Sequence, residues 1–564
     1  MRAVAVLFAL GVVFLVFKVV QIAGRVDVAA SAPATVAVEQ QVDASVARLN
    51  DWFRANWEKE RATVTEPADD LTVFRRLSLS LFGAVPSLED IRTFEADTQP
   101  DRIDRWVVRM LQDSRYSDYF AERLARSLVG VEGGPFIIFR RDRLTSWLAD
   151  QLRNDVSWSQ MTRELIAAEG LWTDQPAANF ITVARIEDEG LDENKLAGRT
   201  VRTFLGQRMD CAQCHDHPLD PEMKTPTSWK QSDFEGFAAF FAQAAISLGG
   251  VTDYPLDDDK NAVVYKVTDP GMSKDDARTI AAAVPFHPEW LPSDGGLRHR
   301  LADWITHKDN RRFERAIANR MWGFMFGKPL HEPVDDLPHP VNGEQDALDI
   351  LGAEFRAGGG RLSTLIRMIA LSDVFQLSSE STSATDEDYA AQIRAWSVFP
   401  LVRLRPEQVI GSLFQAGHIR NIDQNSNPLI RVQKFGNEND FLNEYGDLGD
   451  DELLQQAGTI PQALLRMNGR FTADLSKVDL LTASNQILNL SPDDRAVVEN
   501  SYLACLCRRP TDEEHQFFTD MLRSGKPAEE NESKTSTKPI RDRAEVMQDL
   551  FWTLFNSPEF SWNH

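Results

Sequence analysis

Hydrophobic residues recur along most of this chain at spacings of three and four positions, which is the spacing of one face of an α-helix. The pattern holds from residue 71 to about 241 and returns at residue 297. Ser87 follows Pro86 and precedes Asp90 by three positions, the arrangement that caps the start of a helix. The sequence therefore predicts a mainly α protein with two multi-helix domains, at residues 69–243 and 295–564.

The stretch between the two helical regions has a different composition. Residues 244–294 are rich in glycine and proline, and only the run at 262–267 has the character of a strand. We interpret residues 244–294 as an irregular insert, or linker, with at most a short β element.

The N-terminal residues carry a signal for export. Residues 3–17 are all apolar or small, and the apolar stretch continues past Lys18 to Gly24. The shorter run suits a signal peptide, whereas the full stretch is long enough to span a bilayer of about 30 Å. We expect residues 1–24 to be a signal peptide or a membrane anchor. The body is then exported, in the periplasm or cell envelope, and is either secreted after cleavage or attached to the membrane through residues 3–24.

Residues 25–68 are expected to form a tether followed by an amphipathic helix. The helix covers residues 44–63, and its apolar side holds Val46, Leu49, Trp52, Phe53 and Trp57.

Charge narrows the choice of partners. The 564 residues include 61 Lys+Arg and 85 Asp+Glu, which gives a net charge of −24. This acidic excess repels phosphate backbones, and no basic run in the sequence is longer than an arginine pair. We therefore expect no nucleic-acid partner.

Two of the four cysteines form the strongest motif of the sequence. Cys211-Ala212-Gln213-Cys214-His215 has the C-x-x-C-H spacing of covalent haem c attachment. Two thiols about one turn apart each form a thioether with a haem vinyl group, and the adjacent histidine is the proximal ligand of the iron. This attachment is made on exported chains, so the motif and the N-terminal segment support each other.

Other interpretations of the motif remain open. A thioredoxin-like redox pair needs a βαβ setting, whereas the flanks here have helical patterns. Zinc is the weaker cofactor alternative, with Cys211, Cys214, His217 and a distant residue as ligands, and a structural disulfide is another. Cys505 and Cys507, on a predicted helix at 500–508, are expected to be buried free thiols.

If haem is bound, the sixth iron ligand determines the chemistry. The candidates in the sequence are Met209, Met223, His217, His331, His339 and His564. The helix expected at 196–209 also carries three arginines, any of which could pair with a haem propionate or lie on a solvated face: Arg199, Arg202 and Arg208.

At residues 204–218 and 229–241, around the motif, the sequence resembles the planctomycete-type secreted cytochrome domains. The likeness extends to residues 71–87 and 111–118. The second half resembles the companion domain that often follows, in the stretches at 301–306, 316–327, 332–336, 403–408 and 556–560. The resemblance implies an exported, mainly helical protein with haem c at Cys211, Cys214 and His215, and it implies no assigned activity.

These observations favour an exported c-type haem protein that transfers electrons or supports a redox step at the cell envelope, with a redox partner or envelope protein. The alternative is a non-redox envelope scaffold or carbohydrate-associated binding protein in which the motif is structural. A third hypothesis is a hydrolase or lyase that uses Glu332, Asp335 and Asp336. Arg320 is expected to pair with Asp335 or Asp336. No catalytic residues are predicted.

Overall fold

The structure is a computed structural model, and it describes residues 36–131, 139–186, 190–216, 229–254, 264–268, 272–338, 345–383, 385–423, 426, 453, 459–524 and 542–564. The chain divides into two compact units, Met1–Gln41 and Val42–His564. The predicted signal peptide or anchor at residues 1–24 lies outside the described residues, as do His217, Met223 and His339. Within the described part of the chain, no helix has the length and apolar character needed to cross a membrane.

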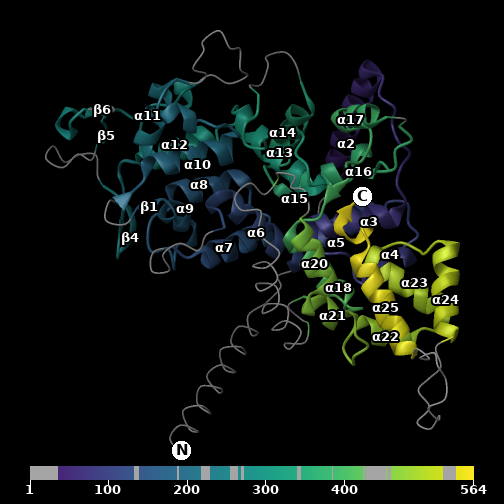
Figure 1. Ribbon diagram of the computed structural model, residues 1–564. Helices are drawn as coiled ribbons and strands as arrows, with labels where there is room; N and C mark the ends of the chain where they lie inside the picture. The colour runs from purple at the N-terminus through teal and green to yellow at the C-terminus, as the bar shows by residue number, and fades with distance from the viewer. Residues whose placement is uncertain are drawn as a thin grey trace, which may run out of the picture. The chain divides into compact units, whose positions relative to one another are not determined.

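The mainly α fold class is confirmed. The helices of the N-terminal half are α2 (Val36–Glu60), α3 (Asp70–Phe82), α4 (Leu88–Ala96), α5 (Arg102–Leu111), α6 (Ser114–Val129), α7 (Arg141–Arg153), α8 (Trp158–Ala167), α9 (Asn179–Thr182), α10 (Glu193–Leu205) and α11 (Gln231–Ala238) (Figure 1). The predicted amphipathic helix is part of α2, where Leu49, Phe53 and Trp57 are buried. Ser87 caps α4 as predicted, because its Oγ accepts a hydrogen bond from the Asp90 N–H at 3.0 Å.

The region predicted as an insert contains more β structure than the single strand expected. β3 (Ala244–Ser247) pairs with β4 (Gly250–Asp253), and β5 (Tyr265–Val267) pairs with β6 (Arg278–Ile280), both antiparallel. These four strands are short and lack the long alternation by which strands are recognised in a sequence. Two further pairs lie elsewhere in the described chain: β1 (Arg185–Ile186) with β2 (Gly190–Leu191), and β7 (Val402–Arg403) with β8 (Trp562–Asn563).

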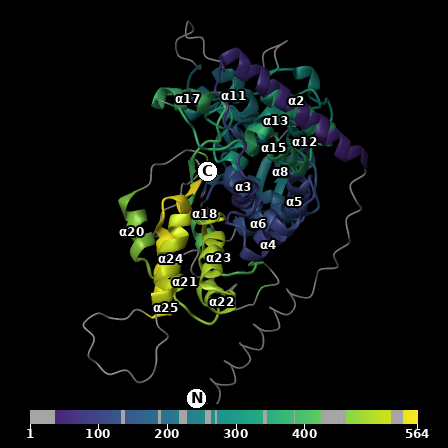
Figure 2. The same cartoon turned by 90° about the vertical axis from the view of Figure 1, so that its right-hand side faces the viewer.

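The C-terminal half is also helical. Its elements are α12 (Leu297–Ile305), α13 (Arg311–Phe326), α14 (Ala347–Ala357), α15 (Leu362–Ala370), α16 (Asp373–Gln376), α17 (Asp386–Ala395), α18 (Pro406–Ala416), α20 (Ile460–Asn468), α21 (Arg470–Ser476), α22 (Ala483–Leu490), α23 (Asp494–Leu506), α24 (Asp512–Ser524) and α25 (Arg543–Asn556). Both views show α21 to α25 as one group of helices (Figures 1 and 2), and a hydrophobic cluster of its own fills that group together with α18.

The two predicted helical regions share one hydrophobic core. A single cluster of buried side chains extends from Val42 to Cys507 and includes residues of both regions. Helix α13 lies at its centre, because every residue from Phe313 to Phe326 is buried. It contacts α3 and α10 of the N-terminal half as well as α14 and α15. The halves are also linked by a hydrogen bond from the Ser80 Oγ to the Met325 carbonyl, at 2.6 Å.

A buried network of ion pairs joins α13 to α14. Arg315 donates to both carboxylate oxygens of Asp346, at 2.6 and 2.8 Å. Arg356 on α14 lies 3.0 Å from the carboxylate of Glu314, whose side chain is only 9% exposed. Burial raises the pKa of Glu314 to about 7, although Arg356 and Arg311 act in the opposite direction. Desolvation of this carboxylate therefore outweighs its ion pair.

This network makes stability depend on pH. The folded protein binds a proton at Glu314 up to about pH 7, whereas the unfolded chain releases it near 4.5. Stability should therefore fall as the pH rises from about 4.5 to about 7. We predict that Glu314→Gln reduces this loss. The melting temperature of the variant minus that of the natural chain should therefore be more positive at pH 8 than at pH 5.

Glu514→Gln is the control for this measurement. A side-chain hydrogen bond from Arg508 lowers the pKa of Glu514 from 4.5 to about 2, so most of its titration lies below pH 5 in both the folded and the unfolded state. The difference in melting temperature between Glu514→Gln and the natural chain should change little between pH 5 and pH 8. An equal offset at both pH values for Glu314→Gln would show that Glu314 does not titrate in this range.

Candidate functional site

The motif follows directly after α10, and a glycine determines where that helix ends. The helix was predicted to reach Met209, but it stops at Leu205 because Gly206 adopts a left-handed conformation, with φ of 60°. A Cβ atom at Gly206 would lie 3.0 Å from Leu337 Cδ1 and 3.2 Å from the Cβ of Ala316 on α13. The Gly206 carbonyl accepts a hydrogen bond from the Leu337 N–H at 2.8 Å. The end of α10 is thus fitted closely to the second half of the chain.

Cys211, Cys214 and His215 lie on and just after a short 3₁₀ turn at Asp210–Gln213. Both thiols are free and exposed, and His215 is half-buried. Met209 and Ala212 are buried and anchor the turn to the core. The structure therefore presents all three predicted site residues on one anchored turn.

Hydrogen bonds connect this turn to the next helix. The Nδ1 atom of His215 lies 2.9 Å from the Asp216 carbonyl. The Asp216 carboxylate accepts a hydrogen bond from the Gln231 N–H, the first residue of α11, at 2.8 Å. With Nδ1 engaged by a carbonyl, Nε2 is the ring nitrogen left to act as a metal ligand.

These donors fit a covalent haem group. Two accessible thiols at this spacing can form the two thioethers, and an imidazole oriented through Nδ1 suits an iron ligand.

A separate group of possible metal ligands lies elsewhere in the described chain. The ligand atoms of Glu169, Asp253 and His299 are within 4.8 Å of one another. Asp253 there already binds the buried guanidinium of Arg298 at 2.7 Å, so a cation is present beside that group.

The sixth-ligand candidates that the structure describes make other contacts. Met209 is buried at the base of the turn. The Nε2 atom of His331 lies 3.7 Å from the Asp346 carboxylate. Burial lowers the pKa of His564 to about 4, and its Nε2 lies 3.8 Å from Glu559.

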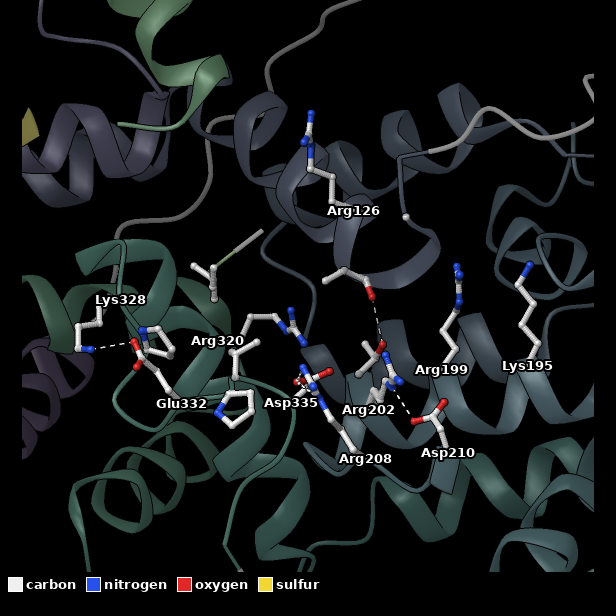
Figure 3. A pocket seen from close by; sticks show the side chains of 17 residues that line it. Arg126, Lys195, Arg199, Arg202, Arg208, Asp210, Arg320, Lys328, Glu332 and Asp335 are labelled. Carbon is white, nitrogen blue, oxygen red and sulfur yellow. Dashed lines mark hydrogen bonds and ion pairs between the residues drawn. The ribbon is translucent and has the colours of Figure 1, made fainter. Parts of the chain in front are cut away.

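A cavity of about 630 Å³ adjoins the turn (Figure 3). Asp210, the residue before Cys211, is part of its wall, whereas Cys211, Cys214 and His215 are not. The described lining comprises Arg126, Ser127, Gly130, Lys195, Arg199, Arg202, Thr203, Arg208, Asp210, Arg320, Lys328, Pro329, Glu332, Pro333, Val334, Asp335 and Leu453. The described lining holds seven cationic side chains and three carboxylates, and Arg126 also pairs with Glu122 outside the lining, at 3.1 Å.

Each carboxylate of the wall pairs with one of its cations. Arg202 Nε donates to Asp210 at 2.7 Å, and Lys328 donates to Glu332 at 2.8 Å. Arg208 Nε donates to Asp335 at 2.9 Å. Asp335 thus pairs with Arg208, which lies in the segment before the motif, and this pair was not predicted. Arg320, the predicted partner of Asp335 or Asp336, lines the same cavity.

The sequence did not reveal this cavity. Arg199, Arg202 and Arg208 were predicted either to meet a propionate or to lie on a solvated face, and in the structure all three line the cavity. Arg202 pairs with nearby Asp210, but much of the remaining wall comes from distant segments: α6, α13 and the residues that follow α13. No local run of basic residues marks the site, because it is assembled only by folding.

The other pair of cysteines has a structural setting. Cys505 and Cys507 are buried and free, as predicted. Cys507 lies just past the end of α23 in a left-handed conformation, and burial raises the pKa of its thiol to about 12. A thiol that stays protonated at neutral pH is a poor nucleophile and a poor metal ligand.

Comparison with protein-family models gives two matches. Residues 48–245 match PSCyt2, and residues 297–440 match PSD1; they are described as proteins of unknown function, DUF1549 and DUF1553. The chain carries a PSCyt2 domain followed by a PSD1 domain. This confirms the resemblance that the sequence indicated. A search of curated proteins gave no match, and a search of solved structures also gave none.

The cavity lies at the junction of the PSCyt2 and PSD1 segments. Its lining residues between 126 and 210 belong to the PSCyt2 match, and those between 320 and 335 belong to the PSD1 match. Helices α10 and α13, which contact each other, supply residues from the two sides.

The fit at Gly206 can be tested by substitution. Gly206→Ala introduces a Cβ atom into a left-handed residue and against Leu337 and Ala316. We predict a loss of stability of about 2 kcal/mol, measured by thermal or denaturant unfolding.

Gly360→Ala is the matched control. Gly360 has a similar φ of 70°, but its nearest contacts to an added Cβ are 3.8 Å away. Gly360→Ala should lower the free energy of unfolding by about 1 kcal/mol, because only the left-handed backbone conformation opposes the alanine. Equal losses for the two variants would contradict a close contact between α10 and the PSD1 segment.

Proposed function

We propose that this protein is an exported c-type haem protein with an electron-transfer or redox role at the cell envelope. The observation that carries the proposal is the turn itself: two exposed free thiols and a half-buried histidine, oriented through Nδ1, lie together beside a basic cavity. The PSCyt2 match supports the proposal, since the name refers to a cytochrome-type family.

The residues of the turn have distinct roles in this proposal. The Sγ atoms of Cys211 and Cys214 would hold the haem covalently, and His215 Nε2 would be a ligand of its iron. Haem supplies reversible one-electron exchange when it is bound. The Asp216 carbonyl fixes the ring of His215, and the bond from Gln231 to Asp216 fixes that carbonyl in turn.

Export supports the same function. The apolar run at residues 3–17 is typical of a segment that directs a chain out of the cytoplasm. Haem c is attached after export, so an exported chain with this motif meets the conditions for attachment. We propose a redox partner or an envelope protein as the molecule with which it exchanges electrons, and attachment to the membrane through residues 3–24 where these are retained.

Covalent haem can be tested directly. The full chain is expressed for export together with a haem-attachment system, and its intact mass and pyridine haemochrome spectrum are recorded. We predict one covalent haem in the natural chain, and loss of the two-thioether product in Cys211→Ala and in Cys214→Ala.

Cys505→Ala is the control, because it removes a buried thiol far from the motif in sequence and should retain the haem. A bare polypeptide mass for the natural chain would contradict the proposal. A mass two hydrogens light, or zinc bound under native conditions, would instead favour a structural motif in a non-redox envelope protein.

A further inference from the structure

Three side chains from separate segments bring possible metal ligands together outside the haem motif. The ligand atoms of Glu169, Asp253 and His299 lie within 4.8 Å of one another. We propose that these three side chains bind one divalent transition-metal ion such as zinc. The proposal does not rest on haem attachment, because it uses none of the three motif residues.

The three ligands come from different parts of the chain. Glu169 follows α8 within the PSCyt2 match, Asp253 ends β4 between the two matches, and His299 lies in the first turn of α12 within the PSD1 match. Gly170 and Val251 exchange two backbone hydrogen bonds, at 2.8 and 2.9 Å, and so hold the segment after α8 against β4. A metal ion here would link the PSCyt2 segment, the insert and the PSD1 segment.

The buried guanidinium of Arg298 fixes the same segments from inside. Its Nη1 atom donates to the carbonyls of Ile166 and Ala168, just before Glu169, at 3.0 and 2.8 Å. Its Nε atom donates to Oδ1 of Asp253 at 2.7 Å. Arg298 itself directly precedes the histidine of the group. Carboxylates that bind metals are commonly held by such a second hydrogen bond, which orients the remaining oxygen.

The remaining donor atoms share one space. Because Arg298 occupies Oδ1 of Asp253, Oδ2 is the oxygen left for a metal. A Cβ atom at Gly296 would lie 3.7 Å from this Oδ2 and 3.4 Å from Nδ1 of His299, so both atoms border the same point. Among the described residues, neither the carboxylate of Glu169 nor the ring of His299 has a hydrogen bond or an ion pair. All three donors are therefore available to one ion.

The donor set selects the kind of metal. One imidazole nitrogen with two carboxylate oxygens suits zinc and its transition-metal neighbours, whereas magnesium and calcium take oxygen ligands. Zinc lies about 2.0–2.2 Å from each ligand, which places neighbouring ligand atoms roughly 3.4 Å apart. Glu169 and His299 are exposed, so their side chains can rotate through the short distance that remains. Three protein ligands leave a fourth position for water.

Zinc binding is measured by isothermal titration of the metal-free full chain. The titration is repeated on the Cys211→Ala, Cys214→Ala double variant, which removes the thiols of the alternative zinc site at the motif. We expect one zinc ion per chain in the double variant, bound in preference to magnesium. Saturating zinc should also raise its melting temperature, because the ion binds the folded chain.

Substitutions in the double variant locate the site. His299→Ala and Glu169→Gln should each weaken zinc binding at least tenfold and remove most of the rise in melting temperature. The matched controls are His307→Ala, just after α12, and Glu164→Gln on α8, which should keep the affinity. The aspartate is left intact, because its loss would remove the carboxylate partner of the buried Arg298.

The proposal is overturned if the double variant binds no zinc, since zinc bound by the natural chain would then belong to the motif. It is also overturned if His299→Ala and Glu169→Gln bind zinc as tightly as the two controls. A chain with covalent haem and no zinc site would contradict the metal proposal alone. Zinc held at this site in a chain that never acquires haem would contradict the haem proposal alone.

Discussion

The complete burial of α13 is the constraint on which the arrangement of the molecule depends. A helix whose side chains are buried from Phe313 to Phe326 must be covered on all sides, and it obtains this cover from both halves of the chain. The PSCyt2 and PSD1 segments therefore pack as parts of one core. The close contact at Gly206 follows from this packing, and so does the position of the cavity where α10 passes α13.

The cavity wall is rich in cations although the chain as a whole is acidic, because many arginines lie inside the fold. Several arginines are drawn into the core as donors to backbone carbonyls: Arg76, fully buried, donates to the Phe375 and Leu377 carbonyls at 2.9 and 2.7 Å and lies over the ring of Phe399. Burial lowers its pKa to about 9. Cations are thus used inside the fold, and the cavity concentrates several of them beside the motif.

Much of the fold could be predicted because it depends on local signals. The apolar side of α2 and the cap at Ser87 are encoded within a few residues, and the three donors of the motif are adjacent in the sequence. The end of α10 was missed because Gly206 adopts its conformation where α10 meets α13, a contact between distant segments. The pair formed by Arg208 and Asp335 was missed for the same reason, and the cavity as a whole has no contiguous signature.

The proposed haem site at Cys211, Cys214 and His215 lies on and just after the turn at Asp210–Gln213, which follows the end of α10 where that helix meets α13. The most direct test of the proposed function is the intact mass of the exported full chain, together with its pyridine haemochrome spectrum. One covalent haem, with the two-thioether product lost in Cys211→Ala and in Cys214→Ala, is the predicted result. A bare polypeptide mass for the natural chain would contradict it.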